Sequence, residues 1–191
     1  MKKNIIIIVL SIAIALLSAL SIIMFVEIDR NKFESIEVER KYIVDVDNLP
    51  EGFKTADIFE MVQTYISFSP EMRVRKTNDL YHFFTMKLPK DDIGLAREEI
   101  EFMITAEEYD ELLKKQVGNT IYKKRYQFYE NKVKIEVDIY SGDLTGLAVA
   151  EIEFANVKKS KAFVPPKWLG TEVTSDFRYK NANLARDGMP S

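Results

Sequence analysis

The feature that most constrains the fold is a spacing of two residues between charged side chains, repeated along the chain. Successive side chains of a β-strand point to opposite faces, so charges two apart line one face of a strand. Most of the residues between them are apolar. The sets are Glu37/Glu39/Lys41, Arg73/Arg75, Glu99/Glu101, Lys123/Arg125, Glu136/Asp138 and Glu151/Glu153. The pattern predicts a sheet with one face built of ions.

Two interpretations fit this pattern. An antiparallel sheet with one face in water shows the same alternation. A surface that serves only solubility, however, usually intersperses the two signs, whereas here acids and bases are segregated by strand. The second interpretation is a closed barrel whose interior carries acidic strands for metal ions and basic strands for a polyanion.

Composition restricts the chemistry of such an interior. The chain has no cysteine and a single histidine, His82, which excludes thiolate metal sites, cysteine nucleophiles and histidine-rich zinc sites. Any metal must then be held by carboxylates, which suit Mg²⁺ or Mn²⁺. The net charge of −3 argues against a nucleic-acid partner, since such surfaces are more often basic.

The N-terminus carries an apolar run, residues 5–26, preceded by Lys2 and Lys3. A helix of this length spans about 33 Å, enough to cross the hydrocarbon core of a bilayer. The layout fits an uncleaved anchor or a cleavable signal peptide with a small-residue site at Ala19-Leu20-Ser21. We favour an anchor over residues 1–27 and a linker over 28–34. We expect a single-pass membrane protein whose folded domain, residues 35–191, lies outside the cytoplasm. A domain on the cytoplasmic side is the alternative.

Alternation and turn signals predict a mainly β fold, a closed antiparallel barrel of eight strands with a few outer helices. A capping box at Thr105–Glu108 predicts an amphipathic outer helix to about Gln116, and a short helix is expected at 181–186. His82 has the opposite strand parity to Lys87 and should face outward. The expected strands are 35–44, 61–68, 71–77, 81–88, 97–104, 120–127, 132–140 and 147–156.

Ions facing inward cannot be buried unpaired, so the interior must be wet, internally paired or filled by ligand and metal. A linear polyphosphate meets these demands, because arginine forks and lysines neutralise its oxygens while divalent ions bridge carboxylates and phosphates. Hydrolysis would be an in-line attack of water on a terminal phosphoryl group.

The ordered motifs resemble the CYTH, or triphosphate tunnel metalloenzyme, superfamily, closest to its bacterial tripolyphosphatase-like branch. Glu37-Val-Glu-Arg-Lys41 is similar to its ExExK signature. The other matching segments are Arg73-Val-Arg75, Lys87, Arg97–Glu101, Lys123–Tyr126, Glu136-Val-Asp138, Ala150–Glu153 and the tail Trp168–Tyr179.

The resemblance implies a charged tunnel and an Mg²⁺- or Mn²⁺-dependent phosphoanhydride hydrolase that acts on inorganic tripolyphosphate. Its catalytic residues would be Glu37, Glu39 and Lys41. Its phosphate-binding residues would be Lys41, Arg73, Arg75, Lys87, Lys123 and Arg125. Its metal ligands would be Glu37, Glu39, Glu99, Glu101, Asp138, Glu151 and Glu153.

Two other functions remain open from the sequence. The same fold could act on a nucleoside or thiamine triphosphate, as a triphosphatase or an adenylyl cyclase, because only the mouth of the tunnel would contact the organic group. Alternatively, the domain could be a membrane-tethered polyphosphate-binding module without catalysis. The sequence leaves the oligomeric state undetermined.

Overall fold

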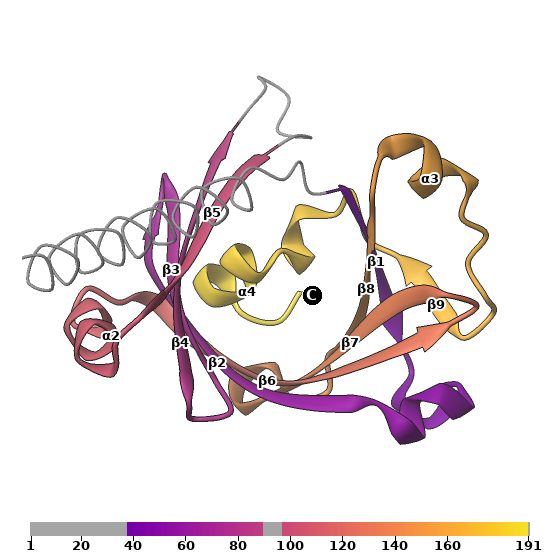
Figure 1. Cartoon of the computed structure of the whole chain (residues 1–191), viewed down its shortest axis with the longest axis horizontal. Helices are drawn as coiled ribbons and strands as arrows, with labels where there is room; N and C mark the ends of the chain where they lie inside the picture. The colour runs from indigo at the N-terminus through magenta and orange to yellow at the C-terminus, as the bar shows by residue number, and fades with distance from the viewer. Residues whose placement is uncertain (1–37, 90–96, 191) are drawn as a thin grey trace, which may run out of the picture. The chain divides into compact units, whose positions relative to one another are not determined.

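Nine antiparallel strands carry the alternating charges, and they form one continuous sheet in the order β5-β4-β3-β2-β6-β7-β8-β1-β9. The computed structural model describes residues 38–89 and 97–190 of the chain. The strands are β1 (Val38–Val44), β2 (Asp57–Phe68), β3 (Glu71–Thr77), β4 (Tyr81–Pro89), β5 (Arg97–Ile104), β6 (Val117–Glu130), β7 (Val133–Ser141), β8 (Ala148–Phe154) and β9 (Leu169–Glu172). The sheet curves strongly around helix α4 (Asn181–Asp187) (Figure 1).

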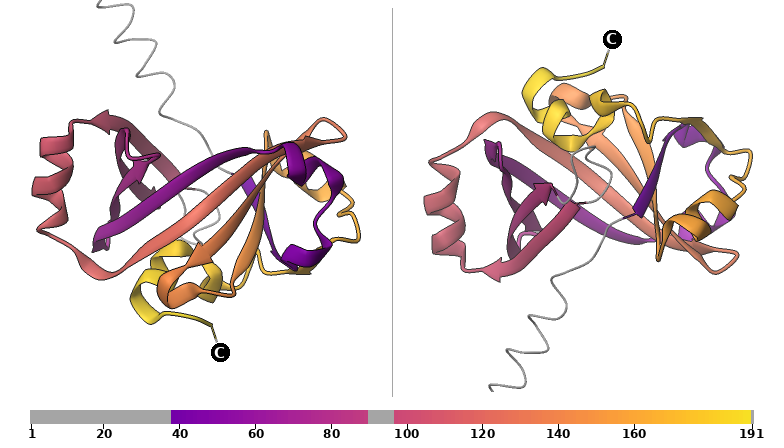
Figure 2. Two further views of the ribbon diagram at one scale, coloured as in Figure 1. Left: turned by 90° about the horizontal axis from the view of Figure 1, so that it is seen from below. Right: turned by 90° about the horizontal axis from the view of Figure 1, so that it is seen from above.

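The two longest strands, β2 and β6, hold the sheet together. Residues 57–65 of β2 pair with β6, and its residues 61–68 pair with β3. Strand β6 in turn pairs with β7 through residues 122–130. Both strands run across the whole width of the domain in the views from below and above (Figure 2). Their pairing therefore joins one half of the sheet, made of β5, β4, β3 and β2, to the other half, made of β6, β7, β8, β1 and β9.

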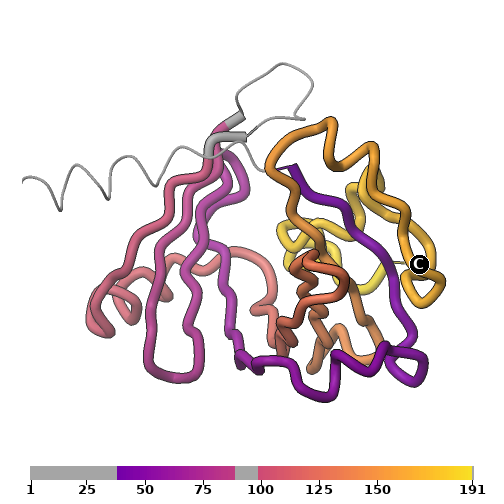
Figure 3. Tube along the Cα trace, turned by 45° about the vertical axis from the view of Figure 1, so that its right-hand side comes forward, coloured from indigo at the N-terminus to yellow at the C-terminus, as the bar shows by residue number. Residues whose placement is uncertain are grey.

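The prediction of a closed eight-stranded barrel is wrong. Strands β5 and β9 are the two edges of the sheet, and no hydrogen-bonded ladder joins them within the described residues. The physical reason lies in the tail. To close the barrel, β5 would have to pair with the free edge of β1, but the ninth strand, Leu169–Glu172, pairs with that edge. Gly170 allows this approach, because a Cβ there would lie 2.6 Å from the carbonyl oxygen of Ile43. The tube view shows the two halves facing one another across the interior (Figure 3).

Apolar clusters on both faces fix this curvature. On the outer face of the β6–β1 half, Tyr42, Ile135 and Ile152 are buried and contact the 3₁₀ turn Glu51–Thr55 through Phe53. That turn ends at Thr55, and β2 begins at Asp57. On the inner face, Tyr65 and Tyr140 pack with Leu184 and Ala185 of α4. The short helix expected at 181–186 therefore covers part of the concave face.

Two more helices complete the domain. Helix α2 (Ala106–Leu113) begins at the predicted capping box and buries Tyr109, whose ring lies 4.8 Å from that of His82. His82 thus faces outward, as its parity predicted. Helix α3 (Val157–Ala162) follows β8 and was not expected from the sequence.

None of the helices within residues 38–89 and 97–190 is long and apolar enough to span a membrane. This finding contradicts the expected single-pass, membrane-anchored location, and we no longer hold that prediction. The segment on which it was based, residues 1–27, lies outside the described part of the chain.

Candidate active site

The inner face of the sheet lines a cavity of about 600 Å³. It collects nearly every predicted site residue that the structure describes, from six strands of both halves. They are Glu39, Lys41, Arg73, Arg75, Lys87, Glu99, Glu101, Lys123, Arg125, Glu151 and Glu153. Asp138 lies beneath this lining and is completely buried. Glu37 lies outside the described residues.

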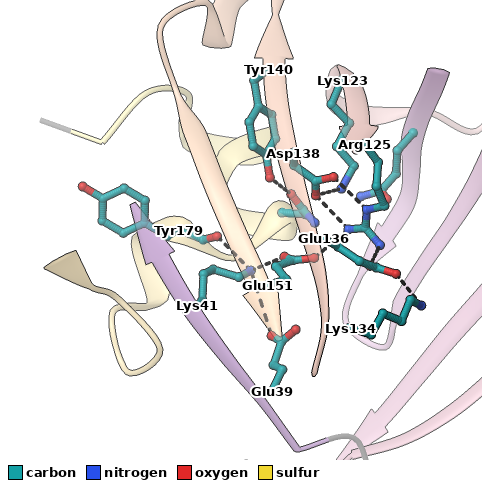
Figure 4. A network of polar contacts seen from close by, with 12 residues as sticks. Glu39, Lys41, Lys123, Arg125, Lys134, Glu136, Asp138, Tyr140, Glu151 and Tyr179 are labelled. Atoms are coloured by element: carbon teal, nitrogen blue, oxygen red, sulfur yellow. Dashed lines mark hydrogen bonds and ion pairs between the residues drawn. The ribbon is translucent and has the colours of Figure 1, made fainter. Parts of the chain in front are cut away.

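Arg125 is the centre of the ionic network at the base of the cavity (Figure 4). Its guanidinium donates two hydrogen bonds of 2.7 Å to Asp138, one of 2.6 Å to Glu151 and another to Glu136. Lys123 Nζ lies 2.5 Å from Asp138 Oδ2, and Lys41 Nζ lies 2.8 Å from Glu151 Oε1. The burial of these charges is therefore compensated in the way that interior ions require.

The protonation states of this network follow from burial and pairing. Burial alone would raise the pKa of the Glu151 carboxyl, but Lys41 and Arg125 hold it well below its ordinary value. The pKa of Asp138 is lowered as well, because Arg125 and Lys123 outweigh burial. Burial lowers the pKa of Lys123 to about 8, although Asp138 opposes the shift. Both carboxylates are thus ionised, and Lys123 has a pKa of about 8.

A second group of cations lies on β3 and β4, opposite acids of β5. Arg75 Nη2 is 3.0 Å from Glu101, and Lys87 Nζ is 2.8 Å from Glu99. Thr85 donates a 2.6 Å hydrogen bond to the second oxygen of Glu101. The Nε atoms of Arg73 and Arg75 are buried without a hydrogen-bond partner in the described structure. Because an orphaned buried donor is costly, these two atoms fit an anion bound in the cavity.

The carboxylates differ in how well they suit a metal ion. Asp138, Glu151, Glu99 and Glu101 are each held by basic side chains. Glu39 and Glu153 lie directly opposite each other on β1 and β8, and Lys41 Nζ lies 3.9 Å from Glu39 Oε1. Like charges in this position repel, which a divalent cation between them would relieve. No group of three potential metal ligands gathers among the described residues. Within the lining that the structure describes, two carboxylates that face each other across neighbouring strands, as Glu39 and Glu153 do, can share a cation.

The cavity also includes polar residues that sequence reasoning missed. Gln63 and Tyr65 lie opposite Arg75 and Arg73 on the neighbouring strand, and Gln63 donates a 3.0 Å hydrogen bond to the Tyr65 hydroxyl. Extending the strand parity along β2 would have found both. Glu71 also lines the cavity, from the start of β3 and with the same parity as Arg73. Four more polar residues come from the tail or from α3, whose positions depend on tertiary packing: Lys161, Thr174, Lys180 and Asn181.

A curved antiparallel sheet whose concave face gathers paired lysines, arginines and carboxylates defines a class of polyanion-binding proteins. Comparison with known families identifies the class, since the CYTH domain model matches residues 35–188. The chain belongs to the CYTH domain family, and the resemblance drawn from its motifs is confirmed.

Two curated relatives and one solved structure are close to the chain. The inorganic triphosphatase of Nitrosomonas europaea is 34% identical over 151 residues, covering 78% of this chain and 96% of the relative. That of Acetivibrio thermocellus is 34% identical over 157 residues, covering 79% and 94%. The crystal structure of the inorganic triphosphatase NE1496 matches with a TM-score of 0.59 and 30% identity, covering 79% of this chain and 95% of that one.

Proposed function

We propose that the protein hydrolyses inorganic tripolyphosphate with the help of a divalent metal ion. The class of enzyme, a triphosphatase, is supported by the two relatives named inorganic triphosphatase. Metal dependence is general among CYTH enzymes. The particular substrate and the roles of individual residues are our proposal, and one observation carries it. Two arginines with orphaned Nε donors share one cavity with six further lysines and arginines.

In this proposal the phosphate oxygens are bound by Lys41, Arg73, Arg75, Lys87, Lys123 and Arg125. Arg73 and Arg75 would donate through the Nε atoms that lack protein partners. Arg125 and Lys123 keep their bonds to Asp138 and so present their charge in a fixed position. Preorganised cations of this kind stabilise the charge that develops on the leaving phosphate chain.

The metal would be held by Glu39 and Glu153, with Glu37 preceding Glu39 by two residues. A divalent ion there would supply charge neutralisation and polarise a phosphoryl oxygen. Mg²⁺ and Mn²⁺ both suit such oxygen ligands. Asp138 and Glu151, which we expected to be metal ligands, act in this proposal by orienting Arg125, Lys123 and Lys41. Glu99 and Glu101 do the same for Lys87 and Arg75.

A substrate panel tests the proposed function. The full-length protein is incubated with tripolyphosphate, pyrophosphate, ATP and thiamine triphosphate, with Mg²⁺ or Mn²⁺ present, and released phosphate is measured. We expect tripolyphosphate to be preferred over ATP by more than about tenfold, because the cavity lining is made largely of groups that bind phosphate. A smaller preference would favour an organic triphosphate. Binding without release under either metal would indicate a binding module.

The pH dependence of substrate affinity should report Lys123. Its pKa near 8 means that its positive charge is lost as the pH rises from 7 to 9. We expect the KM for tripolyphosphate to rise about three- to tenfold over this interval, because a charge-assisted contact is lost. The folded state binds this proton more weakly than the unfolded chain does, so this lysine makes stability increase with pH between about 8 and 10.5. Initial-rate kinetics check the expected rise in KM, and thermal unfolding across this pH range checks the expected increase in stability.

Lys123→Arg is the matched variant for this experiment, because an arginine remains charged throughout. Its KM should change less between pH 7 and 9 than that of the wild type. An equally steep rise in both proteins would show that a different group titrates.

A further inference from the structure

Helix α3 contributes one cation to the cavity from outside the sheet. Val157 and Lys161 are four residues apart, share one face of this helix and both line the cavity. Each of the six cations on the strands lies within 4.0 Å of a carboxylate. Among residues 38–89 and 97–190, no carboxylate forms an ion pair with Lys161. Lys161 therefore adds a positive charge to the cavity that the described protein does not neutralise.

Arg40 fixes the position of this helix. Its Nε and Nη2 donate hydrogen bonds of 2.9 and 2.6 Å to Glu172 on β9. Its Nη1 donates to the carbonyl oxygens of Ser160, at 3.2 Å, and Phe163, at 2.9 Å. These two residues flank Lys161 in the sequence. One guanidinium thus holds the C-terminal end of α3, where a cation is also favoured by the helix dipole.

Strand β1 contributes one basic side chain to the inner face of the sheet and the next one to the outer face. Arg40 and Lys41 are neighbours, so their side chains leave the strand on opposite faces. Lys41 lies inside, against Glu151, while Arg40 lies outside and holds α3 and β9. The strand that supplies an inner phosphate-binding cation therefore also determines where Lys161 meets the cavity.

We propose that Lys161 binds a phosphoryl group beyond the third of a linear polyphosphate, and that Arg40 is the residue that positions it. The inference rests on the proposed function, in which the strand-borne cations hold a triphosphate. An additional phosphoryl group brings further negative charge, and the unneutralised ammonium of Lys161 is available to receive it. Lysine suits this role, since it binds phosphate as a point charge.

The test compares kcat/KM for tripolyphosphate and tetrapolyphosphate in the full-length protein. Lys161→Ala should lower the value for tetrapolyphosphate about tenfold more than the value for tripolyphosphate, mainly through KM, because one charge-assisted contact is lost. Lys159→Ala is the matched control: Lys159 belongs to the same helix and is exposed like Lys161, but it does not line the cavity. Its ratio of the two values should equal that of the wild type. An unchanged ratio in Lys161→Ala overturns the proposal.

The positioning role of Arg40 needs its own variants. Arg40→Ala should shift the same ratio towards tripolyphosphate, and Glu172→Gln, which weakens the Arg40 contact but retains the guanidinium, should shift it less. Thermal unfolding of both variants shows whether they fold. A general loss of activity on both substrates, with the ratio unchanged, would assign Arg40 a purely structural role and overturn this part.

The test of the proposed function is separate from the test of Lys161. Hydrolysis of tripolyphosphate by the wild type tests that function alone. Calorimetric titration with tetrapolyphosphate tests Lys161 whether or not turnover occurs, and weaker binding by Lys161→Ala than by the wild type supports the inference. Equal binding by the two proteins, or no binding by the wild type, overturns it.

Discussion

Replacing Arg125 by alanine is expected to reduce kcat/KM for tripolyphosphate at least about 100-fold and to lower the free energy of unfolding by about 3 kcal/mol. The guanidinium contacts three carboxylates, from Glu136, Asp138 and Glu151, and only 14% of its side chain is exposed. Its removal leaves buried negative charge with fewer partners and takes one cation from the phosphate-binding face. Initial rates and chemical denaturation measure the two effects.

Lys124→Ala is the control for this experiment, since Lys124 is the adjacent residue on the same strand. Its side chain is exposed on the outer face and pairs with Glu60 at 2.8 Å. Exposed ion pairs contribute about 0.2–1 kcal/mol, so little change in stability and none in rate is expected. If Lys124→Ala proves as harmful as Arg125→Ala, the assignment of the two strand faces is wrong.

The two-residue spacing predicted which side chains share the inner face, because strand parity depends only on local geometry. Arg73, Arg125 and Glu151 come from distant parts of the sequence, yet all line one cavity. The predicted range of β3 agrees with the observed strand, Glu71–Thr77. Residues that alternate without interruption were thus placed correctly from the sequence.

Closure and covering of the sheet could not be predicted in this way. Strand β9 has only four residues, and its pairing with β1 brings together positions more than a hundred residues apart. Helix α4 enters the concave face because Leu184 and Ala185 pack against Tyr65 and Tyr140. Such contacts depend on tertiary packing, which local periodicity does not encode.

The roles of individual carboxylates also depended on distances that the sequence lacks. Asp138 belongs to an acidic pair and was expected to bind metal. The structure places its carboxylate 2.5 Å from Lys123 and 2.7 Å from Arg125. Sequence parity gives the face of a side chain, whereas the choice between ligand and ion-pair partner depends on which base lies opposite.

Replacing Glu39 by glutamine should abolish most of the activity while leaving the fold intact. Glu39 lies directly opposite Glu153 across β1 and β8, where like charges repel, and its ion pair with Lys41 is long, at 3.9 Å. Without metal, the variant should therefore be as stable as the wild type or more stable by a few tenths of a kcal/mol. With saturating Mn²⁺, kcat/KM should be at least about 100-fold lower than in the wild type. Steady-state rates as a function of metal concentration measure the loss.

The thermal stability of the same variant separates a metal-binding role from a purely structural one. A ligand that binds only the folded state raises the unfolding temperature, so Mn²⁺ should raise that of the wild type in the absence of substrate. The rise should be much smaller for Glu39→Gln and for Glu153→Gln. Glu60→Gln is the matched control, because Glu60 is an exposed glutamate on the outer face of β2 and is paired with Lys124. An equal rise in all four proteins would show that the opposed glutamates do not hold the metal, and the ligands would then have to include carboxylates now paired with Lys41, Arg75 or Lys87.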